Sequence, residues 1–395
     1  MPSDAPTALL RPSAGAVGVA TFTVLPLFLV GALGIQLSAD IGVPVSALGI
    51  ASAAFFGSGA LASYFAGRVA TAYGVRTTMR ASLVLVIMVL LFLAVGVHSL
   101  AGLVVILALG GMGNALAQPS VNLYLAERID RHRQGTAYGI KQSAIPVAGM
   151  LAGLAVPIIG LTVGWRWAFA LFALPAVLLA IYTPNARLAV RSTQAAAPAL
   201  RLPRKALMVI STGSGLGMAA GSSLSIFLVP GAVVAGWSPG QAGVVFAGAS
   251  IVGVSGRLLS GVLADRRDEK HLQAIALMLV AGAIGFLALA LSHQWLYVVG
   301  ASIAFGFGWG WTGLLIHAVV QLSPADPAAS TGLVQVGTSS GAVIGPLIFG
   351  FIVEHFSYRV AWGAAGLELL LGSAILLVAA ALTRSTLSPT LASTR

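Results

Sequence analysis

The chain has 395 residues, of which 58% are hydrophobic and only 8% are charged. A soluble domain carries about 25% charged residues, so this composition excludes a soluble protein and predicts one that crosses a membrane many times. There is no cysteine, which excludes disulfides and thiolate chemistry. The net charge of +11 is attributed to basic cytoplasmic loops rather than to nucleic-acid binding.

Twelve apolar segments, each long enough to span a bilayer, follow one another along the chain. We expect helices at residues 14–37, 45–67, 81–97, 101–126, 136–160 and 166–183, then at 206–229, 240–263, 272–292, 295–320, 328–352 and 359–382. A Pro-, Ala- and Arg-rich linker at 184–205 separates these two six-helix halves, and polar tails occupy 1–13 and 383–395. Asp40 is expected in the loop after the first helix. The fold class predicted is an all-α membrane protein.

The basic residues are distributed unequally between the two sides of this layout. Only Lys141 and Arg257 lie inside helices, only Arg166 and Arg359 lie in loops on one side, and the other seventeen lie on the opposite side. Because Lys and Arg accumulate in cytoplasmic loops, this asymmetry predicts that both termini are cytoplasmic. A Gly- and Ala-rich composition without cysteine favours a bacterial inner membrane, and we expect a monomer surrounded by lipid.

The two halves repeat each other with a shift of 193–195 residues. Gly67 then corresponds to Gly261, and Gly49 to Gly243. Trp165-Arg166 corresponds to Tyr358-Arg359 in the same way. Parallel repeats of this kind are found in secondary transporters.

A short motif marks the same point in each half. The second half reads Gly261-Val262-Leu263-Ala264-Asp265-Arg266, which resembles the G-x-L-A-D-R signature of the major facilitator superfamily. The resemblance implies twelve helices in two halves, membrane transport, and a gate motif in the loop between helices 8 and 9. Asp265 would then face the start of helix 5 near Gly135-Thr136.

The first half carries a weaker copy of this motif. It holds Gly67, Gly74 and Arg76, but Thr71 stands where the family has an Asp. The helix 11 start near Ala328 therefore lacks its acidic partner. We expect one strong and one weak latch at the cytoplasmic gate.

Two cations lie within apolar segments. Arg257 and Lys141 are each about six residues, or roughly 9 Å, from the cytoplasmic end of helices 8 and 5. A cation at mid-membrane usually faces a cavity, and no acidic residue lies in either helix. Arg257 and Lys141 therefore suit an anionic substrate, because an arginine can donate two parallel hydrogen bonds to one carboxylate. The structural alternative is that both side chains extend to the membrane surface.

Uncharged polar residues complete the candidate binding site. Helix 4 carries amides on one face, at positions four residues apart, which we expect to line a cavity rather than only to join helices. The repeat-related glutamines of helices 5 and 11 are expected to play matching roles, together with a tryptophan in helix 10. These residues are Asn114, Gln118, Asn122, Gln142, Gln335 and Trp311.

His317 and Glu368 are the candidates for proton coupling. A histidine titrates near neutral pH, and Glu368 is the acidic residue inside a predicted helix. The structural alternative for each is a hydrogen-bonded neutral side chain.

Arg257, eight residues before Asp265, also resembles the helix 8 arginine of monocarboxylate and oxalate/formate transporters. Residues 135–146 resemble helix 5 of cyanate-type anion permeases, whereas two signatures of proton-coupled drug antiporters are missing. The resemblance implies transport of a small organic anion, a mono- or dicarboxylate, with protons or by anion exchange. The alternative is efflux of a hydrophobic or cationic compound. No cofactor is expected. The sequence has neither an HExxH motif nor a cysteine that would support an enzyme. A receptor built on the same fold is a further alternative, and a flux assay would distinguish it from a transporter.

Overall fold

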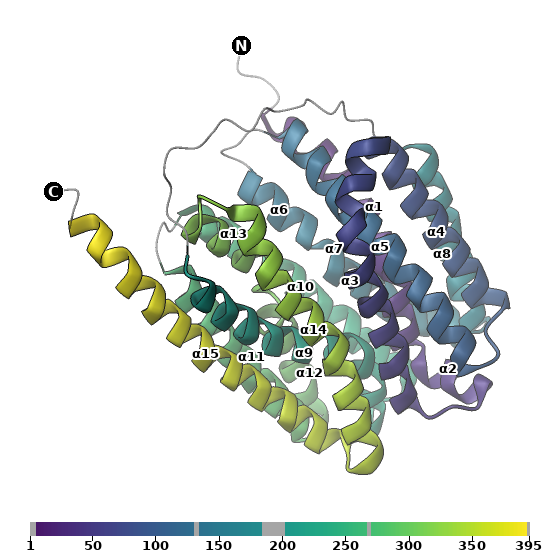
Figure 1. The fold of residues 1–395 in the computed structure, drawn as a ribbon. Coiled ribbons are helices and arrows are strands. Elements are labelled where there is room, and N and C mark those ends of the chain that lie inside the picture. Colours follow the sequence, from purple (N-terminus) through teal and green to yellow (C-terminus); the bar gives the residue numbers. More distant parts are fainter. Residues whose placement is uncertain (1–4, 130–133, 184–201, 267–269, 393–395) are drawn as a thin grey trace.

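The computed structural model describes residues 5–129, 134–183, 202–266 and 270–392, and every regular element within them is helical (Figure 1). The first half contains α1 (Ala5–Ala32), α2 (Gly34–Ile41), η1 (Val45–Ala47), α3 (Leu48–Tyr73), α4 (Val75–Val95), α5 (Leu100–Arg128), α6 (Gln134–Gln142), α7 (Ala144–Ala155), the π-helical turn η3 (Val156–Gly160) and α8 (Trp165–Ile181). The second half contains α9 (Arg204–Val234), α10 (Pro239–Arg266), α11 (His271–Ala290), α12 (Gln294–Ile303), the π-helical turn η4 (Ala304–Gly308), α13 (Thr312–Leu322), α14 (Pro327–His355) and α15 (Tyr358–Ala392).

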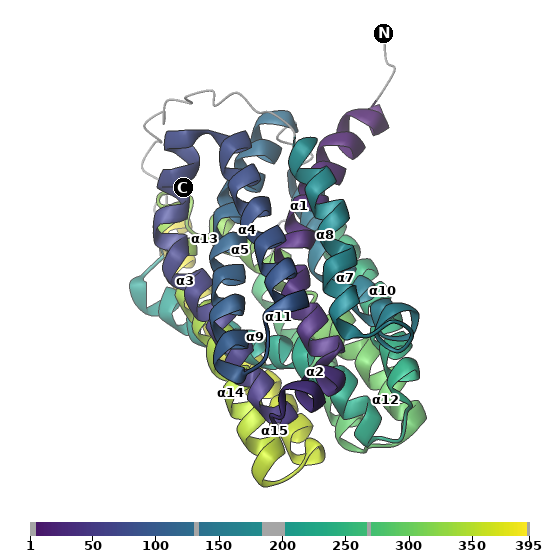
Figure 2. The same cartoon turned by 90° about the vertical axis from the view of Figure 1, so that its right-hand side faces the viewer.

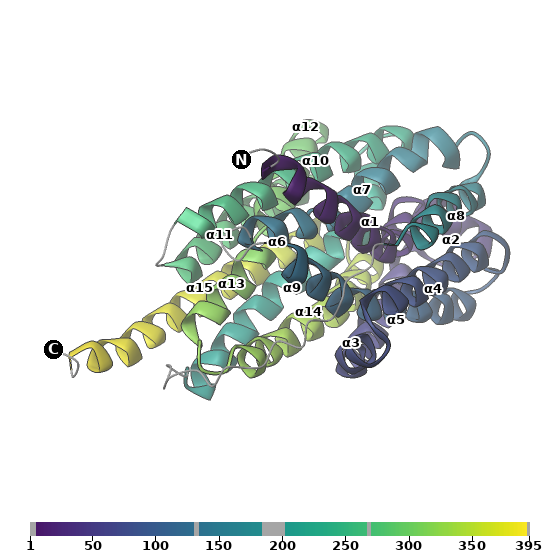
Figure 3. The same cartoon turned by 90° about the horizontal axis from the view of Figure 1, so that it is seen from above.

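The predicted all-α membrane fold is confirmed. Within the described residues, eleven helical stretches are long and apolar enough to cross a bilayer, and Trp165–Ile181 is a shorter apolar helix. Seen from above, the first half and the second half lie side by side, with α1, α6 and α7 next to the second half (Figure 3). The most buried of these stretches is α9, in the centre of the molecule.

Several predicted loops are helical in the structure. The expected loop between helices 2 and 3 shrinks to a turn at Gly74, whose φ of +84° favours glycine because it has no Cβ. Asp40 lies in the short helix α2 rather than in a loop. The first and last helices are longer than predicted, since α1 begins at Ala5 and α15 extends to Ala392.

Two predicted continuous helices are interrupted. Helix 5 is divided at Ser143 into α6 and α7, and its last turn is the π-helical η3. Helix 10 is divided by η4 and the residues that follow it into α12 and α13. Such breaks release backbone carbonyls from the usual helical pattern, and π-turns occur often at functional sites.

The two ends of the bundle differ. We call the end where α8 finishes and α9 begins the linker end, and the other the short-loop end, where α4 meets α5 and α11 meets α12 (Figures 1 and 2). The halves touch closely toward the short-loop end. Ser46 Oγ donates to Glu354 Oε2 at 3.0 Å, and a Cβ added at Gly153 would lie 2.5 Å from the carbonyl oxygen of Gly243.

Toward the linker end, α3 of the first half and α14 of the second half separate. On the face of α14 that meets α3, Gly350 and Pro346 are buried, Val343 is half-buried, and Gln335 and Gly332 are exposed. A Cβ added at Gly332 would meet nothing within 4 Å. On the α3–α14 side the interface between the halves is therefore packed at the short-loop end and opens toward the linker end, whereas α6 stays in contact with α10 and α13 of the second half.

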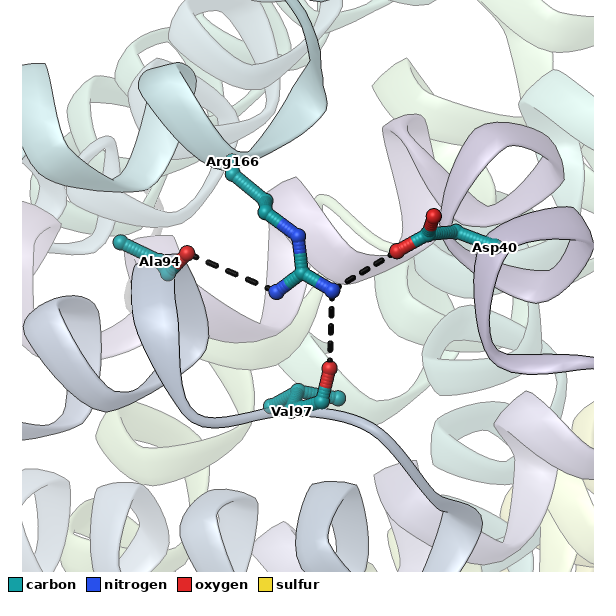
Figure 4. Close-up of polar contacts among 4 residues, drawn as sticks. All are labelled: Asp40, Ala94, Val97 and Arg166. Atoms are coloured by element: carbon teal, nitrogen blue, oxygen red, sulfur yellow. Dashed lines mark hydrogen bonds and ion pairs between the residues drawn. The ribbon is translucent and has the colours of Figure 1, made fainter.

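An arginine fixes the corner of each half at the short-loop end. Arg166 donates to Asp40 at 2.7 Å, to the carbonyl of Val97 at 3.0 Å and to that of Ala94 at 3.5 Å (Figure 4). The repeat-related Arg359 donates from Nε to the carbonyl of Ala290 at 3.3 Å. Arg166 thus donates to carbonyls at the end of α4, and Arg359 donates to a carbonyl at the end of α11.

Candidate functional site

Arg257 lies in the interior and joins the two halves. Its side chain is only 3% exposed, so it does not extend to the membrane surface. Nη1 donates to the carbonyl of Gln142 in the first half at 2.9 Å, and Nη2 donates to the carbonyl of Trp309 in the second half at 3.1 Å. Both acceptors are carbonyls at a helix break. Nε has no hydrogen-bond partner among the described residues.

Lys141 begins a chain of hydrogen bonds that crosses three helices of the first half. It is 6% exposed, and its Nζ donates to Oε1 of Gln118 on α5. Gln118 Nε2 donates to Asn114 Oδ1 at 3.0 Å. The hydroxyl of Thr23 on α1 donates to the same Asn114 oxygen at 3.1 Å. Of the three predicted helix 4 amides, Gln118 therefore bonds Lys141 directly and Asn114 is linked to it through Gln118.

The two cations are connected through consecutive residues of the α6–α7 break. Lys141 is followed by Gln142, whose carbonyl binds Arg257, and consecutive Cα atoms are about 3.8 Å apart. Among the described residues, no carboxylate forms an ion pair with either side chain. A buried charge without a partner is costly, so this arrangement is suited to a bound anion.

An aromatic cluster lies beside Arg257, and its rings come from both halves. The Arg257 guanidinium carbon is 5.4 Å from the centroid of the Trp309 ring. Phe28 of α1 stacks on Trp309 at 5.8 Å and on Phe246 of α10 at 6.2 Å, and all three rings are buried. These side chains form a packed apolar layer next to the cations.

Other predicted binding residues are placed differently. Trp311 is buried against Gly217 of α9 and donates to the carbonyl of Gly308 at 2.8 Å. Gln335 is exposed on α14, and its amide lies 3.4 Å from Ser339 of the same helix. Asn122 is partly exposed and makes no hydrogen bond to a described residue. Gln142 acts through its backbone, so Gln142 and Gln335 do not make matching contacts.

The two candidates for proton coupling lie on other helices. The ring of His317 on α13 is 5.1 Å from that of His271, and its Nε2 is 2.9 Å from Gln321 Nε2. Glu368 is half-buried on α15, which packs against α11 and α9. No contact among the described residues joins either side chain to Lys141 or Arg257.

The gate motif lies on helix ends rather than in loops. In the first half, Gly67 and Thr71 belong to α3, and the exposed Thr71 hydroxyl donates to the carbonyl of Arg68 at 2.9 Å. Gly74 forms the turn, and Arg76 is exposed on α4. In the second half, the motif residues Gly261, Asp265 and Arg266 are the last turns of α10. Their side chains, and the predicted contact of Asp265 with Gly135-Thr136, lie outside what the structure describes.

Sequence patterns did not single out three contributors to this site. Thr23 and Phe28 lie in an apolar helix without any polar periodicity, and Trp309 was noted only as an aromatic residue of helix 10. A signal for Trp309 was available, because it lies in a run of Gly and aromatic residues, Phe305-Gly306-Phe307-Gly308-Trp309. Such a run has poor helix propensity and indicates an irregular helix.

Comparisons with known proteins give a consistent result. Residues 14–333 match the Major Facilitator Superfamily. A protein of Mycolicibacterium smegmatis named an MFS-type efflux pump is 27% identical over 281 residues, which is 66% of this chain and 65% of that protein. The chain thus spans about two thirds of the length of this curated relative.

A solved structure shares the fold. It is a bacterial homolog of the human lysosomal transporter Spinster, in an inward-facing and occupied conformation. It has a TM-score of 0.64 and 15% identity, and covers 94% of this chain and 95% of its own. The family match over residues 14–333, which is most of the chain, shows that the chain belongs to the Major Facilitator Superfamily.

Proposed function

We propose that the protein is a secondary transporter that moves a small organic anion, a mono- or dicarboxylate, across the membrane by alternating access. The observation that carries this proposal is the pair of buried cations, Arg257 and Lys141, with no ion-paired carboxylate among the described residues. The substrate binds between the halves. Arg257 contacts one carboxylate, and the amides linked to Lys141 contribute further donors.

The charge of the site supports an anion over a cation. Intramembrane cations are costly unless they pair with an opposite charge, and here the substrate supplies it. A cationic compound would be repelled by two positive charges at the same level of the bundle. Movement of a charged substrate is balanced by protons or by a second anion, and His317 and Glu368 are the candidates for carrying the proton.

The orientation in the membrane belongs to the same proposal. The seventeen basic residues on one side of the predicted layout support a cytoplasmic position for the linker end and both termini. The packed short-loop end then faces outward, and the α3–α14 side of the interface opens toward the cytoplasm. A bacterial inner membrane and a monomeric state fit the composition and the family.

A second candidate function is the efflux of a hydrophobic or cationic compound. It is favoured by one observation, the similarity to a mycobacterial protein named an MFS-type efflux pump. In that case Glu368 is the residue that matters for substrate or proton, because it is the half-buried acid within a membrane-spanning helix. Arg257 then has only a structural role at the helix breaks.

Thermal unfolding of the purified protein with a panel of ligands separates the two candidates. We expect small carboxylates to raise the unfolding temperature and lipophilic cations to leave it unchanged. A ligand at one hundred times its dissociation constant stabilises by about 2.7 kcal/mol. In Arg257→Gln the shift with carboxylates should disappear, and carboxylate uptake into proteoliposomes should stop.

Two results would contradict the anion assignment. If Arg257→Gln takes up carboxylates at the wild-type rate, the anion assignment is wrong. If lipophilic cations alone stabilise the protein, and Glu368→Gln removes that effect, the efflux function replaces it.

A further inference from the structure

Two amide side chains on α5 are held in one orientation by Lys141. An ammonium group has donors and no acceptor, so the atom of Gln118 that faces Lys141 Nζ must be the carbonyl oxygen Oε1. The amide nitrogen of Gln118 then points back along α5. It donates to Asn114 Oδ1 at 3.0 Å.

Asn114 is oriented by the same chain. Its Oδ1 accepts from both Gln118 and the hydroxyl of Thr23, so the oxygen is directed toward these partners. The amide nitrogen of Asn114 therefore points away from them with two donors, and no described residue accepts from it. The side chain is partly exposed, beside α1, which packs against α9 of the other half.

The polar groups of this network that have no acceptor among the described residues are all N–H donors. Lys141 and Asn114 present N–H groups from the first half, and Arg257 presents its guanidinium from the second. The charge on Lys141 sets this polarity, because it fixes which end of each amide faces outward. A dianion would match the two buried cations, whereas a monoanion would leave one of them without a counter-charge.

We infer that Asn114, held by Gln118 and Lys141, forms a second subsite, and that the substrate is a small dicarboxylate with one carboxylate at Arg257 and the other at Asn114. This inference rests on the proposed transport of organic anions and narrows its substrate class. Gln118 is a positioning residue in this scheme. It acts through the orientation of Asn114.

Succinate and butyrate test the inference, because both have four carbons and differ in the second carboxylate. Binding is measured from the shift of thermal unfolding with ligand concentration. A hydrogen bond to a charged group changes affinity by about tenfold or more, so wild type should bind succinate at least about tenfold more tightly than butyrate. Asn114→Ala should remove this preference by weakening succinate alone.

Gln118→Glu tests the orientation without changing Asn114. A carboxylate at position 118 has acceptors only, so it pairs with Lys141 and takes the amide hydrogens of Asn114, which then turns its oxygen outward. Succinate affinity should fall about tenfold, and butyrate affinity should change little. The matched control is Gln241→Glu, which adds the same charge at the exposed start of α10.

The outcomes are distinct from those of the transport proposal. If Asn114→Ala and Gln118→Glu both keep the preference for succinate, the second subsite is wrong, even if Arg257→Gln abolishes binding. If wild type binds butyrate as tightly as succinate, the dicarboxylate class is wrong. If neither these acids nor any other carboxylate of the panel raises the unfolding temperature of wild type, the anion function itself fails.

Discussion

Two arginines, Arg257 and Arg166, show what a sequence can and cannot reveal about single residues. Arg257 was identified because a cation inside an apolar segment is rare. The carbonyl of Gln142 is left without its helical donor because Pro146, four residues later, has no N–H, and this much is readable from the sequence. That it and the carbonyl of Trp309 meet Arg257 could not be predicted, because this depends on how α6, α10 and η4 pack. Arg166 was noted only as a loop residue and a repeat position. Its hydrogen bonds to carbonyls depend on the close approach of α8 to the end of α4 and the turn that follows it.

Removal of Arg166 should destabilise the first half more than loss of its ion pair alone. Asp40 and Arg166 are 47% and 30% exposed, and such a pair contributes about 0–1 kcal/mol, so Asp40→Asn should have a small effect. Arg166→Ala also leaves the carbonyls of Ala94 and Val97 without this donor, at a cost of about 1–3 kcal/mol. The control is Arg359→Ala, which removes one described bond. Unfolding midpoints should rank Asp40→Asn above Arg166→Ala; the reverse order would show that the ion pair is the main contribution.

At the scale of elements, hydropathy located the helices and misjudged their ends. Twelve apolar segments were sufficient because each must satisfy its own backbone in lipid. The loop between α3 and α4 was predicted too long, since Arg68 and Arg76 are charged but still helical. Close approach of α7 and α10 depends on Gly153 and Gly243, and the shifted repeat had indicated Gly243 without its contact.

A methyl group at Gly243 should shift the balance between conformations. Its Cβ would lie 2.5 Å from the carbonyl oxygen of Gly153 and 2.8 Å from Val156 Cβ, which forces α7 and α10 apart at the packed end. Such overpacking costs typically about 1–3 kcal/mol, so the conformer packed at the short-loop end should lose at least about fivefold in population. The reporter is thiol labelling of Gly332→Cys, in a chain that has no other cysteine.

The direction of the labelling change identifies the cause. Gly243→Ala should slow labelling at position 332, because that site is open in the present conformer and would be covered when the linker end closes. Gly248→Ala on the same helix is the control, since its Cβ would meet nothing within 4 Å. Equal labelling in both variants would mean that contact between α7 and α10 does not set the conformational balance.

At the scale of the molecule, the repeat and the motif at Gly261–Arg266 indicated the fold, and composition excluded a soluble protein. Neither could predict which end of the interface is packed, because both conformers of such a protein share one sequence and one set of helices. The structure supplies that information through contacts such as Ser46 with Glu354. The pairing of Lys141 with the α5 amides was likewise beyond the sequence, because helix spacing gives a shared face and no partner.

If the halves must separate at the short-loop end during transport, a covalent tie across that end should stop it. Ser46 and Glu354 belong to different halves and are joined by a hydrogen bond of 3.0 Å. In the double variant Ser46→Cys/Glu354→Cys, a short bifunctional thiol reagent should abolish carboxylate uptake into proteoliposomes, and a reductant should restore it. The matched control is Trp237→Cys/Trp295→Cys, whose parent rings are 6.0 Å apart within the second half. The same reagent should leave uptake by the control variant intact, because a tie within one half does not restrain movement between the halves. If uptake continues after the cysteines at positions 46 and 354 are linked, transport proceeds without opening this end.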